Sequence, residues 1–163
     1  MVVATKLKAF LDARKVVYQV LKHHERFTSQ EIAEALHVPG RMLAKVVIAK
    51  ADGTLRMAVL PGDLRLDLKK FAKAAAAKEA ALATEAEFRD AFPDCEIGAM
   101  PPFGNLYAMR VIVDKALAAD EQIVFEAGNH HEAIKLLYAD FARLVVPQVA
   151  DIARAAAVGS MSG

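Results

Sequence analysis

The sequence predicts an α+β fold, a mixed and mostly antiparallel sheet covered by helices. Two strand-like, mostly apolar runs, 43–49 and 55–60, flank the dipeptide Asp52-Gly53, which is a good hairpin signal. Two Thr-x-x-Glu patterns, at 28–31 and 84–87, are typical of helix N-termini. Strand-like and helix-like segments do not alternate regularly, so a doubly wound parallel sheet is not indicated.

The first forty residues predict a helix, a strand and a second helix. Apolar residues recur at helical spacing over 2–14, and 16–21 is rich in β-branched and aromatic residues. A polar connection over 23–27 leads to a short helix from Thr28 through Leu36. Pro39-Gly40 then ends this helix and turns the chain.

The middle of the chain predicts the hairpin and two further helices. Pro61-Gly62 ends the second hairpin strand, and a helix begins near Leu66 and reaches into the alanine run 74–77. The second capping pattern opens a helix that includes Phe88 and Phe92.

The last third predicts three strands and a helix. Strands are expected over 106–113, 122–125 and 134–137, with a turn at Gly128-Asn129 between the last two. A helix beginning at Tyr138 is expected to be interrupted by Pro147 and to resume to about Ala157.

Length and composition favour one domain, residues 1–157, with a flexible C-terminal tail over 158–163. The single cysteine, Cys95, excludes an internal disulfide and suits a reducing compartment. No apolar run approaches the roughly 18–20 residues of a membrane span. Charges at Lys6, Lys8, Asp12 and Arg14 are atypical of a signal peptide. We therefore expect a cytoplasmic protein with no membrane partner.

Positive charge is concentrated in one segment. The chain carries a net charge of +1, but residues 41–78 contain nine Lys or Arg against three Asp, which makes this segment +6 and the remainder −5. Such a local excess can bind a polyanion. The alternative is a set of solvated helix and strand faces.

A rigid, shaped loop is predicted over residues 98–104, Gly-Ala-Met-Pro-Pro-Phe-Gly. The two prolines fix φ and lack an N–H group, while Gly104 lets a ligand approach the main chain. An ordinary turn is the alternative.

Common catalytic motifs do not occur. The sequence has no phosphate-binding glycine loop and no His-Glu-x-x-His motif, and no catalytic triad is legible. Adjacent residues point apart, so the run His130-His131-Glu132 is a poor metal site. Acidic neighbours of Cys95 raise a thiol pKa rather than lower it. We expect neither a metal nor another cofactor.

Lys45 is the exception, because it opens the otherwise apolar strand 43–49. A lysine in this position must extend to solvent, pair with an acid or line a pocket. The alternative is an exposed lysine at a strand end.

Several motifs together resemble the YbaK/ProX family of bacterial aminoacyl-tRNA deacylases, which is related to the editing domain inserted in bacterial prolyl-tRNA synthetase. The resemblance covers roughly residues 15–145. It rests on the order and spacing of Lys45, the helix start at 66–72, the loop 98–104, the strand 111–113 with Asp114, the segment 125–128 and the closing 139–141.

This resemblance implies a partly barrel-like sheet and trans-editing, the hydrolysis of the ester that joins a wrong amino acid to tRNA. It places Lys45 and the main chain of Gly104 at the catalytic centre. Met100, Pro101 and Phe103 are expected to wall a small apolar pocket, to which Gly128, Asn129 and His130 contribute. Pro101 stands where the family often has Ser or Thr, so a hydroxyl group is missing.

The implied partners are aminoacyl-tRNA, which Lys69, Lys70 and Lys73 are expected to contact, and an aminoacyl-tRNA synthetase. An already activated ester requires no nucleophilic side chain, so a positioned water and oxyanion donors suffice. Two alternatives stay open: a non-catalytic tRNA-binding or synthetase-associated module of the same fold, and a small-molecule hydrolase that uses the same pocket.

Overall fold

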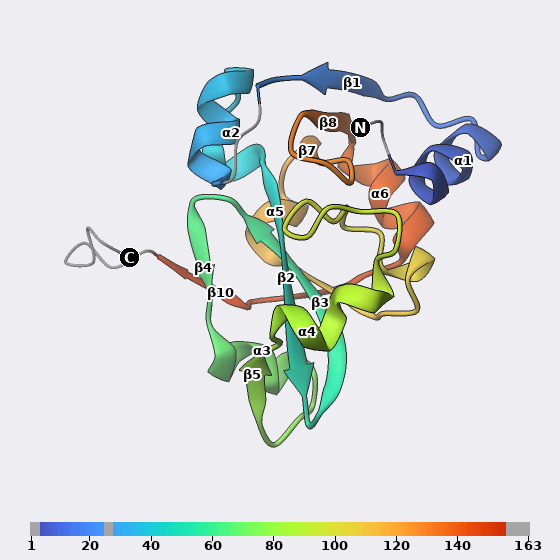
Figure 1. The fold of residues 1–163 in the computed structure, drawn as a ribbon. Coiled ribbons are helices and arrows are strands. Elements are labelled where there is room, and N and C mark those ends of the chain that lie inside the picture. The colour runs from blue at the N-terminus through green and yellow to red at the C-terminus, as the bar shows by residue number, and fades with distance from the viewer. Residues whose placement is uncertain (1–3, 25–27, 156–163) are drawn as a thin grey trace.

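The computed structural model describes residues 4–24 and 28–155 of the chain. Its centre is a five-stranded mixed sheet with the strand order β5-β2-β3-β6-β9 (Figure 1). The strands are β2 (Ala44–Ala51), β3 (Thr54–Pro61), β5 (Ala80–Leu82), β6 (Val111–Asp114) and β9 (Gln148–Ala150). β5, β2 and β3 are antiparallel, whereas β3, β6 and β9 run parallel.

The central hairpin forms as predicted. β2 and β3 pair in register from Ala44 opposite Pro61 to Ala51 opposite Thr54. Between them Asp52 and Gly53 have φ of 48° and 83°, the left-handed conformation at both turn residues that matches the twist of the strands. The Asp52 carboxylate also accepts hydrogen bonds from the main-chain N–H groups of Lys78 and Glu79, which hold the start of β5 beside the turn.

Two smaller antiparallel sheets complete the strands. One has the order β1-β8-β7, formed by β1 (Gln19–Lys22), β8 (Glu132–Leu137) and β7 (Gln122–Glu126). The other pairs β4 (Leu64–Leu66) with β10 (Ala153–Ala155). A parallel bridge from Leu43 to Val124 links the three-stranded sheet to the start of β2. The predicted α+β class is confirmed, and within the described residues the sheets do not close into a barrel.

Helices surround these sheets (Figure 1). Both predicted capping boxes are formed, at Thr28 with Glu31 and at Thr84 with Glu87. The α-helices are α1 (Thr5–Ala13), α2 (Ser29–Leu36), α3 (Leu68–Ala74), α4 (Glu85–Phe88), α5 (Lys115–Ala118) and α6 (Tyr138–Val145), and the 3-10 turns are η1 (Gly40–Met42), η2 (Arg89–Ala91) and η3 (Gly104–Leu106).

Two predicted elements are wrong in part. The strand expected over 106–113 begins only at Val111, because η3 and the left-handed Ala108 (φ 57°) precede it. The strand expected over 16–21 begins at Gln19, and β4, β5 and α5 were not predicted.

The helix expected after Pro147 is also wrong. Val146 ends α6 in the left-handed conformation (φ 51°), and the chain then forms β9 and β10. Pairing with β6 and β4 supplies the backbone hydrogen-bond partners that a short helix would otherwise provide internally. The end of that predicted helix at 156–157 and the predicted tail 158–163 lie outside the described residues.

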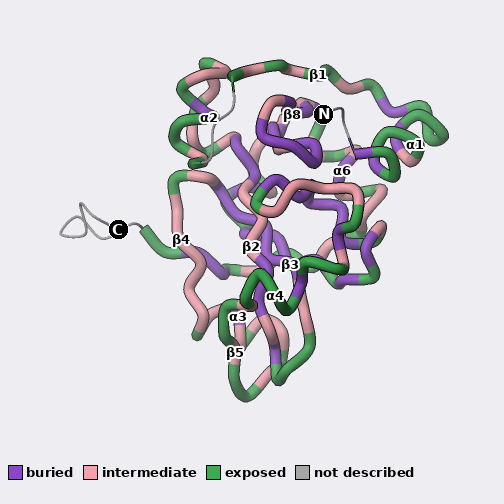
Figure 2. The backbone as a smooth tube through the Cα atoms, viewed as in Figure 1, coloured by how far each residue is buried: buried purple, intermediate pink, exposed green. Residues whose placement is uncertain are grey.

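Buried segments gather in the middle of the molecule (Figure 2), and several of the fully buried side chains are aromatic. Phe103 is fully buried, with ring centroids 5.5 Å from Phe125 and 5.4 Å from Phe141. Leu7 and Leu11 of α1 belong to the same cluster. The loop 98–104, the strand β7 and the helix α6 therefore share one core, which fixes the position of the loop.

Candidate active site

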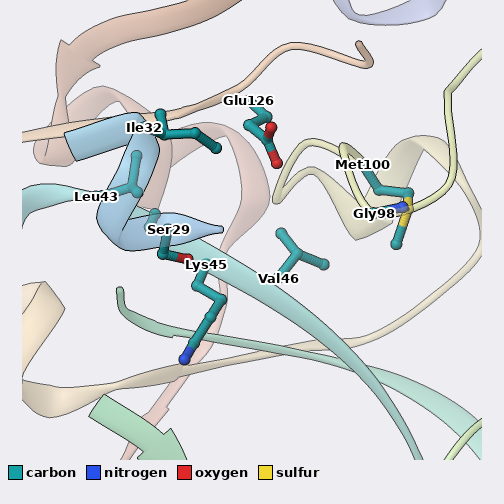
Figure 3. Close-up of a pocket in the computed structure, with 9 residues that line it drawn as sticks. Ser29, Ile32, Leu43, Lys45, Val46, Gly98, Met100 and Glu126 are labelled. Carbon is teal, nitrogen blue, oxygen red and sulfur yellow. The ribbon is translucent and has the colours of Figure 1, made fainter. Parts of the chain in front are cut away.

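A small cavity of about 180 Å³ lies between the start of β2, the start of α2, the loop at 98–100 and the end of β7 (Figure 3). Polar and apolar surface contribute about equally to its walls, and its polar side chains come from Ser29, Lys45 and Glu126. The lining residues are Ser29, Ile32, Leu43, Ala44, Lys45, Val46, Gly98, Met100 and Glu126.

Lys45 is half-buried at one side of this cavity. Its ammonium group donates a hydrogen bond of 2.5 Å to the main-chain oxygen of Leu64. Burial lowers the pKa of Lys45, and so does the positive charge of Arg65, while Asp63 opposes both effects. Lys45 is therefore not the exposed strand-end lysine of the alternative interpretation. Its ammonium group can provide N–H donors to a ligand.

A second, more open cavity of about 1000 Å³ adjoins the first. It lies between α2 and the segment 62–65 that leads into β4. Ser29 and Lys45 line both cavities. These two residues therefore mark the junction between a small cavity and a larger groove.

Glu126 contributes the carboxyl group of the small cavity, and its side chain is 14% exposed. Burial raises the pKa of Glu126 to about 8, and the negative charge of Glu96 acts in the same direction. Its Oε1 lies 3.3 Å from Nδ1 of His130, whose side chain is 7% exposed. Nε2 of His130 in turn lies 3.1 Å from the main-chain oxygen of Ile97.

The predicted loop contributes only part of the wall. Met100 lines the cavity, as does Gly98. Pro101 and Phe103 are buried and are not among the lining residues. Gly104 is also outside the lining, and its carbonyl accepts the N–H groups of Tyr107 and Met109.

Close packing explains the glycine at position 104. A Cβ atom there would lie 2.6 Å from the main-chain oxygen of Met109 and 2.6 Å from a methyl group of Val111. The structure thus gives Gly104 a place in the packing of the loop against β6.

The predicted turn residues Gly128, Asn129 and His130 do not themselves line the cavity. The side chain of Asn129 accepts hydrogen bonds from the N–H groups of His131 and Glu132 and donates to the carboxylate of Glu132. Gly128 packs against Ala4, where a Cβ atom would lie 2.7 Å from the alanine Cβ. Of this predicted trio, His130 is the residue that contacts a cavity-lining side chain, that of Glu126.

The predicted tRNA-binding lysines lie on α3 and do not line either cavity at Lys45. Lys69 and Lys73 are exposed. Lys70 is half-buried, and its ammonium group donates to Asp151 at 3.2 Å and to the main-chain oxygen of Ala153 at 3.0 Å. Lys70 therefore has a role in joining α3 to the segment before β10.

Ser29 and Glu126 were not identified from the sequence. Ser29 follows the capping residue Thr28, and a capping pattern indicates a helix start and not a ligand site. A usable signal for Glu126 was present, because a carboxyl group stands between Phe125 and Ala127, which are both fully buried.

Cys95 lies outside the cavity, and burial raises the pKa of its thiol to about 12. Its sulfur contacts the hydroxyl group of Tyr107 at 3.4 Å and the carboxylate of Asp94 at 3.5 Å. A thiol with this pKa is a poor nucleophile at neutral pH. Among the described residues, no group of three or more His, Cys, Asp or Glu side chains is placed to hold a metal ion.

Comparison with known families decides how this arrangement is classified. The model of the aminoacyl-tRNA editing domain matches residues 23–144, a range that contains Lys45, the loop 98–104 and Glu126. The chain belongs to the aminoacyl-tRNA editing domain family. This confirms the resemblance to YbaK/ProX proteins.

Relatives of this editing domain include free-standing proteins and parts of larger ones. The multifunctional Ser/Thr-tRNA deacylase ProXp-y of Escherichia coli (strain K12) is 26% identical over 156 residues, which cover 93% of each chain. The proline–tRNA ligase of Thiobacillus denitrificans is 32% identical over 103 residues, 63% of this chain and 18% of the ligase.

Solved structures share the fold. A crystal structure of a proposed trans-editing enzyme for prolyl-tRNA synthetase superposes with a TM-score of 0.79 at 21% identity, covering 93% of this editing domain and 96% of that chain. Within the described residues, no helix has the length and apolar character needed to cross a membrane.

Proposed function

We propose that the protein is a trans-editing aminoacyl-tRNA deacylase, which hydrolyses the ester of a small amino acid attached to the wrong tRNA. The observation that carries this proposal is the place of Lys45 at the junction of the two cavities. An aminoacyl ester joins a small group to a large one, so its carbonyl belongs at such a junction. Membership of the editing domain family and the full-length similarity to a Ser/Thr-tRNA deacylase support the proposal.

Each cavity takes one side of the ester. The amino acid enters the small cavity, and the 3′-terminal nucleotide lies in the open groove beside α2. The Lys45 ammonium donates to the ester carbonyl oxygen and stabilises negative charge as the tetrahedral intermediate forms. Because the ester is already activated, a water positioned at the junction completes the reaction without a nucleophilic side chain.

The amino acid is a small one, because about 180 Å³ must also hold its α-amino group and the carbonyl. Met100 and Val46 bound the space on the side away from Lys45 (Figure 3). An apolar wall excludes large side chains by overlap but separates small ones weakly, by about 1–3 kcal/mol per methylene group.

Transfer RNA is the macromolecular substrate, and we place part of its backbone along α3. Lys69 and Lys73 are exposed there, and phosphate neutralisation by lysine gives salt-dependent affinity. An aminoacyl-tRNA synthetase is a further partner, in line with the similarity to a proline–tRNA ligase. The reaction takes place in the cytoplasm, where charged tRNA is used.

The experiment is a deacylation assay on a panel of tRNAs charged with labelled alanine, serine, threonine and phenylalanine. The proposal predicts release of a small amino acid well above the buffer rate and little release of phenylalanine. Binding of charged tRNA without release from any substrate would instead favour the non-catalytic module. Hydrolysis of small free esters with no effect on charged tRNA would favour the small-molecule hydrolase.

A further inference from the structure

Glu126 faces the small cavity, and a buried histidine lies directly behind it. Oε1 of Glu126 is 3.3 Å from Nδ1 of His130, and the other ring nitrogen of His130 is 3.1 Å from the main-chain oxygen of Ile97. A carbonyl oxygen only accepts hydrogen bonds, so Nε2 carries a proton. In the neutral ring, Nδ1 is then an acceptor that faces the carboxyl group.

Within the described residues, Oε1 of Glu126 has no hydrogen-bond partner of its own. The atom is buried, and its 3.3 Å approach to Nδ1 of His130 is a close contact only. Burial raises the pKa of Glu126 and so favours the protonated, neutral carboxyl group when no cation is near.

Main-chain hydrogen bonds hold the turn between Glu126 and His130 in place. The N–H of Gly128 donates to the oxygen of Ala99, and the N–H of Glu96 donates to the oxygen of Gly128. Gly98 lies beside the ring of His130 and has a φ of +90°, a conformation that favours glycine. The main-chain bonds anchor the turn between Glu126 and His130 to the segment 96–99, and the carboxyl group of Glu126 lies at the cavity wall.

We infer that Glu126, backed by His130, binds the α-amino group of the aminoacyl ester and is a specificity-determining residue of this site. The inference rests on the proposed deacylase function. Every aminoacyl ester carries an α-ammonium group two bonds from its carbonyl carbon. In the small cavity, Lys45 attracts the carbonyl oxygen and repels the ammonium, and Glu126 is the lining residue with a carboxyl group.

Binding of the cation changes the form of Glu126. An ammonium beside Oε1 favours the carboxylate, so the carboxyl group releases its proton to water as the ammonium binds. The carboxylate then accepts a charge-assisted hydrogen bond from the ammonium, which is stronger than a neutral one. The site therefore distinguishes an amino ester from an ester without the amino group.

The test compares an aminoacyl-tRNA with its α-hydroxyacyl counterpart, prepared by treating the same charged tRNA with nitrous acid. The two esters have nearly the same size, so the cavity volume does not separate them. Rates of the native protein, Glu126→Gln, Glu126→Asp and the control Glu96→Gln are each divided by the uncatalysed rate of the same ester. Glu96 is the neighbouring acid that does not line the cavity.

We expect the native protein to prefer the amino ester by about 10- to 100-fold in normalised kcat/KM, the range typical of one charge-assisted contact. Glu126→Gln should bring this preference to within about threefold, through a higher KM for the amino ester, with the rate on the hydroxy ester unchanged. The preference of Glu126→Asp for the amino ester should lie between those of the native protein and Glu126→Gln. Glu96→Gln should keep the preference of the native protein.

Two results would overturn the inference while leaving the deacylase proposal intact: an unchanged preference in a folded Glu126→Gln protein, or an equal loss on both esters. Melting temperatures and circular dichroism establish that each variant is folded. If the native protein hydrolyses no aminoacyl-tRNA, the proposed function itself is wrong, and this inference falls with it.

Discussion

The ammonium group of Lys45 donates a 2.5 Å hydrogen bond to the main-chain oxygen of Leu64. This contact joins the start of β2 to the start of β4, and Lys45 lines both the small cavity and the open groove. An ammonium group has three N–H donors, so the bond orients the side chain and leaves donors for a substrate oxygen. The placement of a single side chain thereby connects the two halves of the proposed ester site.

Replacement of Lys45 by alanine should lower deacylation by at least about 100-fold, the scale on which loss of one electrostatic stabiliser acts. Lys45→Arg should restore only part of the rate, because a planar guanidinium does not replace a compact ammonium. The measurement is release of labelled amino acid from the substrate that the native protein hydrolyses fastest.

Lys50→Ala is the matched control for this variant. Lys50 lies on the same strand, pairs with Glu87 at 2.6 Å and is not among the residues lining the small cavity, so its removal should change the rate less than about twofold. Loss of the bond to Leu64 should cost Lys45→Ala about 1 kcal/mol of stability, which leaves it folded. Native turnover in Lys45→Ala would show that the reacting ester lies elsewhere.

Shortening Met100 should relax the size limit of the cavity. Met100 is 5% exposed and lines the small cavity, whereas Met109 is 8% exposed and does not. Met100→Ala should raise the rate on a bulkier aminoacyl-tRNA relative to the alanyl form by about tenfold or more, since each methylene group is worth about 1–3 kcal/mol. The assay is the substrate panel described above, with the two rates expressed as a ratio.

Met109→Ala serves as its control, because both substitutions remove the same atoms from the core and should cost a similar 2–5 kcal/mol of stability. Only Met100→Ala should change the ratio of bulky to small substrates. An equal change in both variants would mean that core loosening, and not the cavity wall, sets the size preference.

Charge reversal on α3 should weaken tRNA binding and flatten its dependence on salt. The double variant Lys69→Glu with Lys73→Glu changes exposed residues only. Each lost phosphate contact should reduce the slope of log affinity against log salt by about 0.7 to 0.9. Lys70 is left in place because it holds Asp151 and the segment before β10.

A reversal of Lys8 in α1 and Lys15 shortly after it is the comparison, since it changes the net charge equally and α1 lies far from α3 (Figure 1). Affinities measured between 50 and 200 mM salt should differ between the two double variants. If they coincide, the lysines of α3 are a solvated helix face and the tRNA lies on another surface.

Stability should depend on pH through Glu126. The unfolded carboxyl group ionises at its ordinary pKa of 4.5, whereas the folded one has its pKa raised to about 8. The native state therefore retains a proton that the unfolded state releases, and the native protein loses stability as pH rises from about 4.5 to about 8. Burial is the main cause of this raised pKa, and the negative charge of Glu96 acts in the same direction.

The side chain at position 126 cannot ionise in the Glu126→Gln variant. The free energy of unfolding of this variant should therefore rise relative to that of the native protein as pH increases from about 4.5 to about 8. At about 1.4 kcal/mol per pKa unit the gain amounts to a few kcal/mol, measured by urea unfolding at pH 5 and pH 8. Glu96→Gln removes a negative charge, lowers the pKa of Glu126 and should shrink the pH-dependent loss. A constant difference between Glu126→Gln and the native protein at both pH values would contradict the raised pKa.

Cys95→Ser should leave deacylation unchanged, because the thiol lies outside the cavity and has its pKa raised to about 12. For the same reason the native thiol should react slowly with iodoacetamide at pH 7, since only the thiolate is nucleophilic. Loss of activity in a folded Cys95→Ser protein would support a thiol mechanism instead.

Several elements could be predicted from the sequence because the interactions that form them are local. The capping pairs Thr28 with Glu31 and Thr84 with Glu87 satisfy helix N–H groups within one turn, and Asp52-Gly53 closes the hairpin between adjacent residues. Such signals depend on groups a few positions apart, so no tertiary partner is needed to interpret them. The short strands after Pro147 were missed because their hydrogen bonds are made to β6 and β4, far away in the chain.

By itself the sequence determined the α+β class, the central hairpin, the editing family and the prominence of Lys45. Met100 was expected at the pocket, but only the tertiary structure added Ser29 and Glu126 to the cavity lining and placed Phe103 and Gly104 in the packed interior. The physical reason is that a cavity wall is made of side chains from separate elements. Their meeting depends on how β2, α2, β7 and the loop pack together, and no local pattern encodes that packing.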